Sequence, residues 1–147
     1  MVDAINGFLV LNDPSIASYA STMEAVGASD NIDPRFFAAI AAAENGQYQN
    51  NPYGLGPNGS ATFSSIGDAT ASLGAALQWY FNTWNETTVA ELWSGNAWIT
   101  VRGKPWITKQ APAYCVGSGC QTTGSRIASN LQSMGGDPNN LKFPCPD

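Results

Sequence analysis

The chain contains no histidine, and only 12% of its 147 residues are charged. The absence of histidine excludes Ser-His-Asp and Cys-His catalysis and most zinc sites. Lysine and arginine number six against eleven aspartates and glutamates, so the net charge is −5 and a basic surface for nucleic-acid phosphates is not expected. We also expect no metal, no cofactor and no membrane span. Any acid–base chemistry must therefore come from carboxylates, tyrosines or lysines.

Cysteines are few as well, and they stand at positions 115, 120 and 145. Two glycines between Cys115 and Cys120 would let a small loop close, so we favour a Cys115–Cys120 disulfide over a pair that includes Cys145. A disulfide indicates an oxidising compartment, and we expect a secreted or periplasmic protein. No signal peptide is visible, and the start fits either a mature domain whose leader was removed or an artificial start.

What the chain does contain is aromatic and amide side chains. Aromatic residues make up 11% of the sequence, with five tryptophans and five tyrosines. A weakly charged surface with many amides and aromatic rings suits a carbohydrate partner better than a nucleic acid. The length predicts a single domain over residues 1–147 that can bury a substantial core.

One helix organises the sequence, and it is expected between Asp33 and Gly46. Asp33 is a candidate N-cap, Pro34 fits the first helical position, and the alanines that follow are strong helix formers. Gly46 is the expected stop. The turn-rich segment that follows, residues 47–60, is either a connector or the wall of a sugar cleft.

A lone carboxylate, Glu44, stands at the far end of this helix. Phe37, Ile40 and Ala41 precede it by seven, four and three residues, so we expect Glu44 on the face that points into the core. Burial and the negative end of the helix dipole would then both raise its pKa, which makes it a candidate general acid. The alternative is that the helix simply ends in solvent at Glu44.

The rest of the chain predicts a helical protein. Further helices are expected over residues 13–27, 65–84, 88–93 and 124–134. Ser65 and Thr88 are the expected N-caps of two of them, each followed three residues later by an acidic side chain. Short strand or irregular structure is expected over residues 95–108, and the apolar residues 2–12 are not assigned to an element.

Three motifs in order carry a resemblance to a known family. They are Ile32-Asp33-Pro34 leading to Glu44-Asn45-Gly46, then Asn51-Pro52-Tyr53-Gly54-Leu55, then Phe63-Ser64-Ser65-Ile66-Gly67-Asp68-Ala69. Over about residues 30–135 their order and spacing resemble the lysozyme-like superfamily, closest to bacterial cell-wall N-acetylglucosaminidases and lytic transglycosylases. The chain departs from that family's pattern at Asn45, where a serine is usual, and around Tyr114, where Ala-Pro-Ala-Tyr-Cys replaces Tyr-Ala-x-Asp-Pro.

The resemblance implies a mainly α, lysozyme-like domain with a short strand segment beside a cleft. It implies that Glu44 is the general acid, that Asn51, Tyr53 and Gly54 line the substrate cleft, and that Tyr114 faces Glu44. The implied substrate is the β-1,4 bond of an N-acetylated glycan, in peptidoglycan or a chitin-like strand, cut by a monomer. Hydrolysis and formation of an anhydro sugar both remain open.

A second catalytic carboxylate is not evident. Glycosidases usually place two carboxyls about 5 Å apart, or roughly 6.5–9.5 Å apart, although substrate-assisted routes use one. Asp68 and Glu91 have expected capping roles, and Glu86 is expected on the polar side of a helix end. Either the substrate's N-acetyl group assists, or neutral groups such as Tyr114 position a water, or the domain binds glycan without cleaving it. A helical interaction domain is a further alternative, which predicts an exposed patch drawn from Trp84, Trp93, Trp98 and Trp106.

Overall fold

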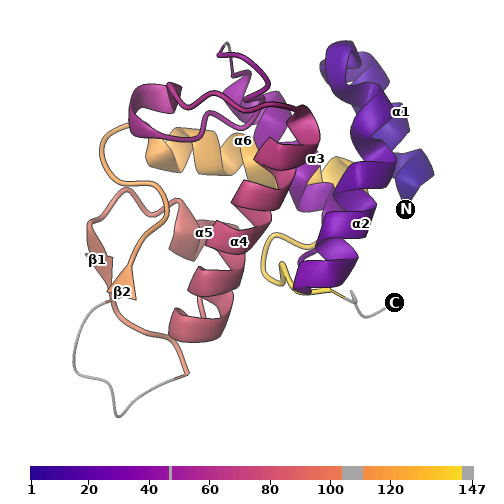
Figure 1. Ribbon diagram of the computed structural model, residues 1–147. Coiled ribbons are helices and arrows are strands. Elements are labelled where there is room, and N and C mark those ends of the chain that lie inside the picture. Colours follow the sequence, from indigo (N-terminus) through magenta and orange to yellow (C-terminus); the bar gives the residue numbers. More distant parts are fainter. Residues whose placement is uncertain (47, 104–110, 144–147) are drawn as a thin grey trace.

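The computed structural model describes residues 1–46, 48–103 and 111–143, and it shows a mainly helical protein (Figure 1). The α-helices are α1 (Val2–Asn12), α2 (Ala20–Asp30), α3 (Pro34–Glu44), α4 (Ile66–Trp84), α5 (Val89–Leu92) and α6 (Cys120–Ser133), with 3₁₀ helices η1 (Pro14–Tyr19) and η2 (Pro57–Gly59). Strands β1 (Trp98–Ile99) and β2 (Ala111–Pro112) pair antiparallel. The expectation of a mainly helical fold with a short strand segment is confirmed. Within the described ranges, no helix is long and apolar enough to cross a membrane.

Helix α3 forms the centre of the core. The Asp33 side chain accepts a hydrogen bond from the Arg35 N–H at 3.0 Å, which confirms the predicted N-cap. Phe36, Phe37 and every residue from there to position 41 are fully buried, because α3 packs against α1, α2 and α6. Figure 1 shows α1 and α2 together on one side of the molecule and the β1–β2 pair on the other.

Several predicted helix bounds are wrong. The helix expected over residues 13–27 starts with the 3₁₀ helix η1, and its α-helical part, α2, begins only at Ala20. Helix α2 does not stop at Gly27 but continues to Asp30, and Asn31 ends it in the left-handed conformation with φ 58°. Gly27 is needed for a different reason: a Cβ there would lie 2.6 Å from the carbonyl oxygen of Ile32 and 2.7 Å from Cγ of Pro34. Helix α6 begins at Cys120, four residues before the predicted start at Gly124.

The predicted capping residues of α4 and α5 are confirmed. Ser65 Oγ accepts a hydrogen bond from the Asp68 N–H at 3.0 Å. Thr88 Oγ1 accepts from the Glu91 N–H at 3.1 Å and donates to Glu91 Oε1 at 2.8 Å. These contacts are local, so the sequence spacing alone is enough to specify them.

The unassigned residues 2–12 form α1, with Ile5 and Leu9 fully buried. At the other end of the described chain, residues 137–143 run between distant parts of the fold. The N–H of Asp33 donates to the carbonyl of Leu141 at 2.8 Å, and the N–H of Leu141 donates to the carbonyl of Thr87 at 2.9 Å. This tail therefore ties the α2–α3 junction to the segment between α4 and α5.

Candidate functional site

A cleft of about 790 Å³ opens at the C-terminal end of α3. Its walls come from the loop of residues 48–59, from one side of α4 and from residues 114–116. Glu44, Tyr53, Gly54 and Tyr114, four of the five predicted site residues, are among the residues that line it. Among the described residues of the lining, Glu44 is the one carboxyl-bearing side chain, and there is no lysine or arginine.

Glu44 is exposed, which corrects the expectation that it points into the core. The fully buried stretch of α3 ends at Ala41, and exposure increases through Ala42 and Ala43 to Glu44. The side chain nevertheless lies against the cleft wall and not in open solvent: a Cβ built on Gly54 would lie 3.3 Å from Glu44 Oε2. Glu44 therefore stands at the mouth of a concave site, reachable by a ligand.

Partial burial of the carboxyl raises the pKa of Glu44 above the ordinary glutamate value. The indole N–H of Trp93 acts in the opposite direction, since a nearby donor favours the charged form. No formed hydrogen bond to this N–H is found among the described residues, so Trp93 is close to the carboxyl but not well aligned with it. Desolvation is the larger effect, and it favours a protonated Glu44.

Gly54 lets the loop approach the acid. Its φ of +65° lies in the left-handed region that favours glycine. The same residue leaves no side chain between the loop and Glu44, so the carboxyl faces main chain at close range.

Asn51 does not line the cleft but is buried behind its wall, with 1% exposure. Its Nδ2 donates to the carbonyl oxygens of Leu55 at 2.9 Å and Ala61 at 2.8 Å, and its Oδ1 accepts from the Leu55 N–H at 2.9 Å. A buried amide with several main-chain partners fixes the loop conformation. Asn51 thus shapes the wall on which the predicted substrate would lie.

Tyr53 also belongs mostly to the interior, since only 2% of it is exposed. Thr70 uses its hydroxyl proton to bond the Ile66 carbonyl, so the Tyr53 hydroxyl is the donor to Thr70 Oγ1 at 2.7 Å. Burial raises the pKa of Tyr53 well above the usual tyrosine value. Its ring packs edge-on against Phe37 of α3 with the centroids 6.3 Å apart, and so joins the loop to the core.

Tyr114 and two aromatic residues that the sequence did not single out as site residues form the opposite wall. Tyr114 lies 4.8 Å from Trp93 and 5.8 Å from Tyr80, measured between ring centroids, and all three line the cleft. Burial, and after it the charge of Glu44, raise the pKa of Tyr114 above the usual tyrosine value. Helical spacing assigns Tyr80 to the core stripe of its helix, and only the neighbouring chain segment reveals that it borders a cleft.

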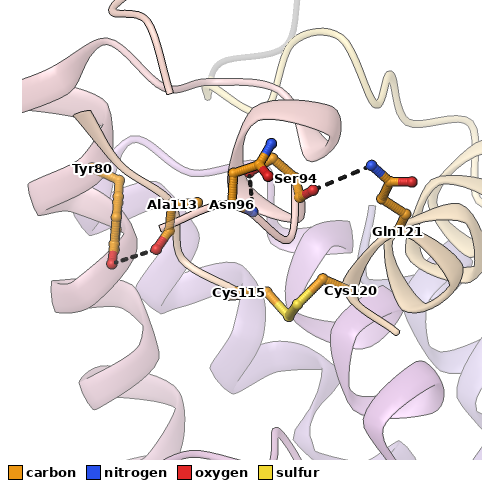
Figure 2. Close-up of a disulfide and its surroundings, with 7 residues drawn as sticks. All are labelled: Tyr80, Ser94, Asn96, Ala113, Cys115, Cys120 and Gln121. Atoms are coloured by element: carbon orange, nitrogen blue, oxygen red, sulfur yellow. Dashed lines mark hydrogen bonds between the residues drawn. A yellow bond between two sulfur atoms is a disulfide. The ribbon is translucent and has the colours of Figure 1, made fainter. Parts of the chain in front are cut away.

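The predicted Cys115–Cys120 disulfide is present and adjoins this wall (Figure 2). It links the residue after Tyr114 to the first residue of α6. Main-chain bonds hold the same segment: the Cys115 N–H donates to the Leu92 carbonyl at 2.8 Å, and the Gly95 N–H donates to the Cys115 carbonyl at 3.2 Å. Cys145, the alternative partner, lies outside the described residues.

Glu86 is fully buried, which corrects its predicted place on the polar side of a helix end. Among the described residues, neither of its carboxyl oxygens has a hydrogen-bond partner. Burial, and to a lesser extent the charge of Glu91, raise the pKa of Glu86 to about 8. Glu86 does not line the cleft, and the described lining offers no second carboxylate beside Glu44.

Exposure differs among the tryptophans of the predicted surface patch, and metal ligands do not cluster, in the described part of the chain. Within it, no three Cys, Asp or Glu side chains gather to hold a metal ion. Trp93 is 1% exposed and cannot belong to a surface patch, whereas Trp98 is 56% exposed. Trp106 lies outside the described residues.

Comparisons with known proteins add no identification to this geometry. The chain matched no protein-family model, no curated protein and no solved structure.

Proposed function

We propose that the protein cleaves the β-1,4 bond of an N-acetylated glycan, such as peptidoglycan or a chitin-like strand, with Glu44 as general acid. The observation that carries the proposal is a lone, accessible carboxyl of raised pKa in an otherwise uncharged cleft. The cleft volume of about 790 Å³ falls in the range of ligand sites, roughly 300–1,000 Å³. A neutral sugar chain suits walls made of main chain, amides and aromatic rings.

Catalysis would begin with the protonated Glu44 carboxyl. Its proton passes to the glycosidic oxygen as the bond between that oxygen and the anomeric carbon breaks. The leaving sugar departs as a neutral alcohol and Glu44 becomes a carboxylate. Attack by water on the anomeric carbon returns a proton to Glu44 and completes hydrolysis.

The positive charge that develops on the anomeric carbon needs a partner. No second carboxylate lines the described part of the cleft, so the substrate's own N-acetyl oxygen is the nucleophile that fits best. Its attack gives a cyclic intermediate, which water opens. We expect Tyr114 to hydrogen-bond the substrate or the water, because it lines the same cleft as Glu44.

The same observation favours one rival, a glycan-binding domain on this fold that does not cleave. A digest of purified peptidoglycan and of N-acetylchitohexaose, followed by mass spectrometry, separates the two. Cleavage products support the enzyme, and their mass shows whether the new end is a reducing sugar or an anhydro sugar. Retention of the intact oligosaccharide with no product selects the binding domain.

Substitution of the acid is the decisive experiment for the enzyme. We expect Glu44→Gln to lower glycan cleavage by about 10²- to 10⁴-fold, the usual contribution of a general acid, without loss of thermal stability. Glu24→Gln, on α2 and outside the cleft, is the matched control and should keep full activity. An active Glu44→Gln variant would refute the proposal.

The pH profile gives a second readout from the same protein. A general acid works only while protonated, so activity falls as the pH rises through its pKa. Because burial raises the pKa of Glu44, the alkaline limit of activity should lie above 4.5, the ordinary glutamate value. A limit at or below that value would contradict the assignment of Glu44.

The remaining parts of the proposal concern the setting. The disulfide is compatible with an oxidising compartment, so we place the protein outside the cytoplasm, secreted or periplasmic. We propose that it acts as a monomer, because the cleft is built from one chain. Membership of the lysozyme-like superfamily, which the motifs resemble, is likewise proposed.

A further inference from the structure

A second pocket, of about 440 Å³, lies behind the wall of the cleft. It lies between α5, the loop of residues 94–96, α6 and the tail at residues 138–139. The two pockets share a single described lining residue, Trp93, so they are neighbours that meet at this residue. The second pocket is therefore a distinct site and not an arm of the first.

The walls of this pocket are held in place by contacts within the protein. Gly124 of α6 packs directly on Trp93, since a Cβ at that glycine would lie 2.8 Å from the Trp93 Cβ. Gln121 Nε2 donates to the Ser94 carbonyl at 3.3 Å, and the Asn96 N–H donates to Ser94 Oγ at 3.2 Å. Figure 2 shows these bonds beside the disulfide that fixes the start of α6. The shape is thus preformed, as in most ligand sites.

The chemistry of the lining selects a neutral ligand. None of the described residues that line it is charged. Amide and hydroxyl side chains surround the opening, with Asn96, Gln121 and Ser125 exposed. Val89 and Trp93 are buried beneath them and give the floor an apolar character. Such a site disfavours phosphates and ions, which need charged or closely gathered partners.

A sugar fits this lining better than a peptide. Peptides are commonly bound through an open sheet edge or along an apolar helical groove, where main-chain or apolar contacts dominate. Here the polar groups belong to side chains on α6 and on a loop, arranged around a small apolar floor. Hydroxyl-rich rings with one apolar face match that arrangement.

We propose that this pocket is a second glycan-binding site, which holds an N-acetylated sugar outside the cleft of Glu44. The choice of glycan rests on the proposed function. A polymer with many equivalent sugars can occupy both sites, so the second site raises the apparent affinity for the polymer through effective concentration. A short oligosaccharide in the cleft would gain nothing from it.

Titration of the isotope-labelled Glu44→Gln variant with N-acetylchitotetraose, followed by amide NMR, tests both sites at once. Shifts at Gln121 and Asn139 report the second pocket, and shifts at Asn45 and Gly54 report the cleft. Shifts in both groups support both proposals, and shifts at the second pocket alone support this inference while contradicting the proposed function. Shifts in the cleft alone overturn the second site, and no shift anywhere overturns both.

A filled pocket tests the role of the site on polymer. Ser125→Phe, at an exposed lining position of α6, should weaken co-sedimentation with purified peptidoglycan by about tenfold and leave cleavage of N-acetylchitohexaose unchanged. Thr122→Phe, exposed on the same helix but outside the lining, is the matched control and should bind normally. Equal binding by both variants would overturn the proposal.

A second variant and a peptide titration complete the test of the second pocket. If Ser125→Phe unfolds, the double change Gln121→Ala and Asn139→Ala removes polar contacts without adding bulk, and the same loss of polymer binding is expected. A neutral peptide, acetyl-trialanine amide, is titrated in parallel by NMR. Shifts at Gln121 and Asn139 with this peptide but not with the oligosaccharide would overturn the assignment to a glycan.

Discussion

Helices α3 and α4 end in the same way and yet carry two different glutamates. Asn45 follows α3 with φ 48° and Asn85 follows α4 with φ 55°, and a glutamate stands directly beside each asparagine. Burial raises the pKa of Glu44 and of Glu86 alike. Only Glu44 opens onto a cleft. A raised pKa is therefore no sign of catalysis by itself; access for a substrate distinguishes the two sites.

The largest effect that we expect is on the pH dependence of protein stability, and it comes from the buried carboxyl of Glu86. Its pKa of about 8 in the folded protein lies above 4.5, the ordinary glutamate value, so between these values the folded state keeps a proton that the unfolded state releases. Stability should accordingly fall as the pH rises through this window. Glu86→Gln removes the titrating group. The free energy of unfolding of this variant relative to wild type should therefore rise by at most ~4 kcal/mol as the pH increases from 4 to 8.

Chemical denaturation at several pH values measures this difference, with Glu44→Gln as the comparison. The Glu44→Gln variant should show a much smaller pH-dependent gain, because that side chain is exposed. Glu86→Gln should also retain glycan cleavage. Loss of cleavage in that variant would place Glu86 in the catalytic machinery and remove the distinction between the two helix ends.

A smaller effect is expected from the disulfide, which adjoins the Glu44 end. Replacing Cys115 and Cys120 by serine opens a loop of six residues and should cost about 2 kcal/mol of stability by the loop-entropy relation. Glycan cleavage should fall too, since Tyr114 directly precedes the bridge. Thermal melts and turnover measure both effects.

Cys145→Ser is the control for this variant, because it leaves the Cys115–Cys120 bridge intact. The pH dependence of stability assigned to Glu86 should persist in the double serine variant. If the double variant matched wild type in both melting temperature and turnover, the bridge would have no part in holding the cleft wall.

The smallest effect on stability is expected from an alanine at Gly54, and it tests why this position is a glycine. An alanine at this position takes a left-handed φ of +65°, which costs roughly 1–2 kcal/mol, and its Cβ would lie 3.3 Å from Glu44 Oε2. Gly135→Ala is the matched control, since its φ is +83° but it lies outside the cleft lining, and the nearest atom to its Cβ would be 3.5 Å away, on Arg35. Similar losses of stability are expected from both, measured by thermal melts.

Activity should separate these two glycine variants. Gly54→Ala crowds the acid and should lower turnover and displace the alkaline limit of the pH profile. Gly135→Ala lacks that contact and should keep the profile of wild type. Identical pH profiles would mean that the close approach of the loop does not influence Glu44.

Local signals in the sequence are sufficient for several features of this fold. The caps at Asp33, Ser65 and Thr88 are predictable because each needs only a side chain and a main-chain N–H two or three residues away. The Cys115–Cys120 bridge follows from a short glycine-containing spacing. The cleft position of Glu44, Tyr53, Gly54 and Tyr114 rests on the family resemblance, and the structure brings these residues together around one hollow.

The features that sequence reasoning misses depend on contacts between distant segments. Gly27 has the pattern of a helix stop, but it marks the place where Pro34 approaches α2. Helical spacing puts Glu44 with the core residues, yet it cannot show that full burial ends at Ala41, three residues before it. Glu86 is expected to be exposed because nothing in residues 80–90 reveals how the surrounding chain covers it.

The tail at residues 137–143 has a consequence for how the protein is made. It pairs with chain that is synthesised about a hundred residues earlier, at Asn31 and Asp33, and with Thr87 between them. A ribosome therefore exposes the first three helices well before their final hydrogen-bond partners emerge. These hydrogen bonds can form only after residues 137–143 have left the ribosome. We therefore expect the native fold to be completed late in the synthesis of this domain.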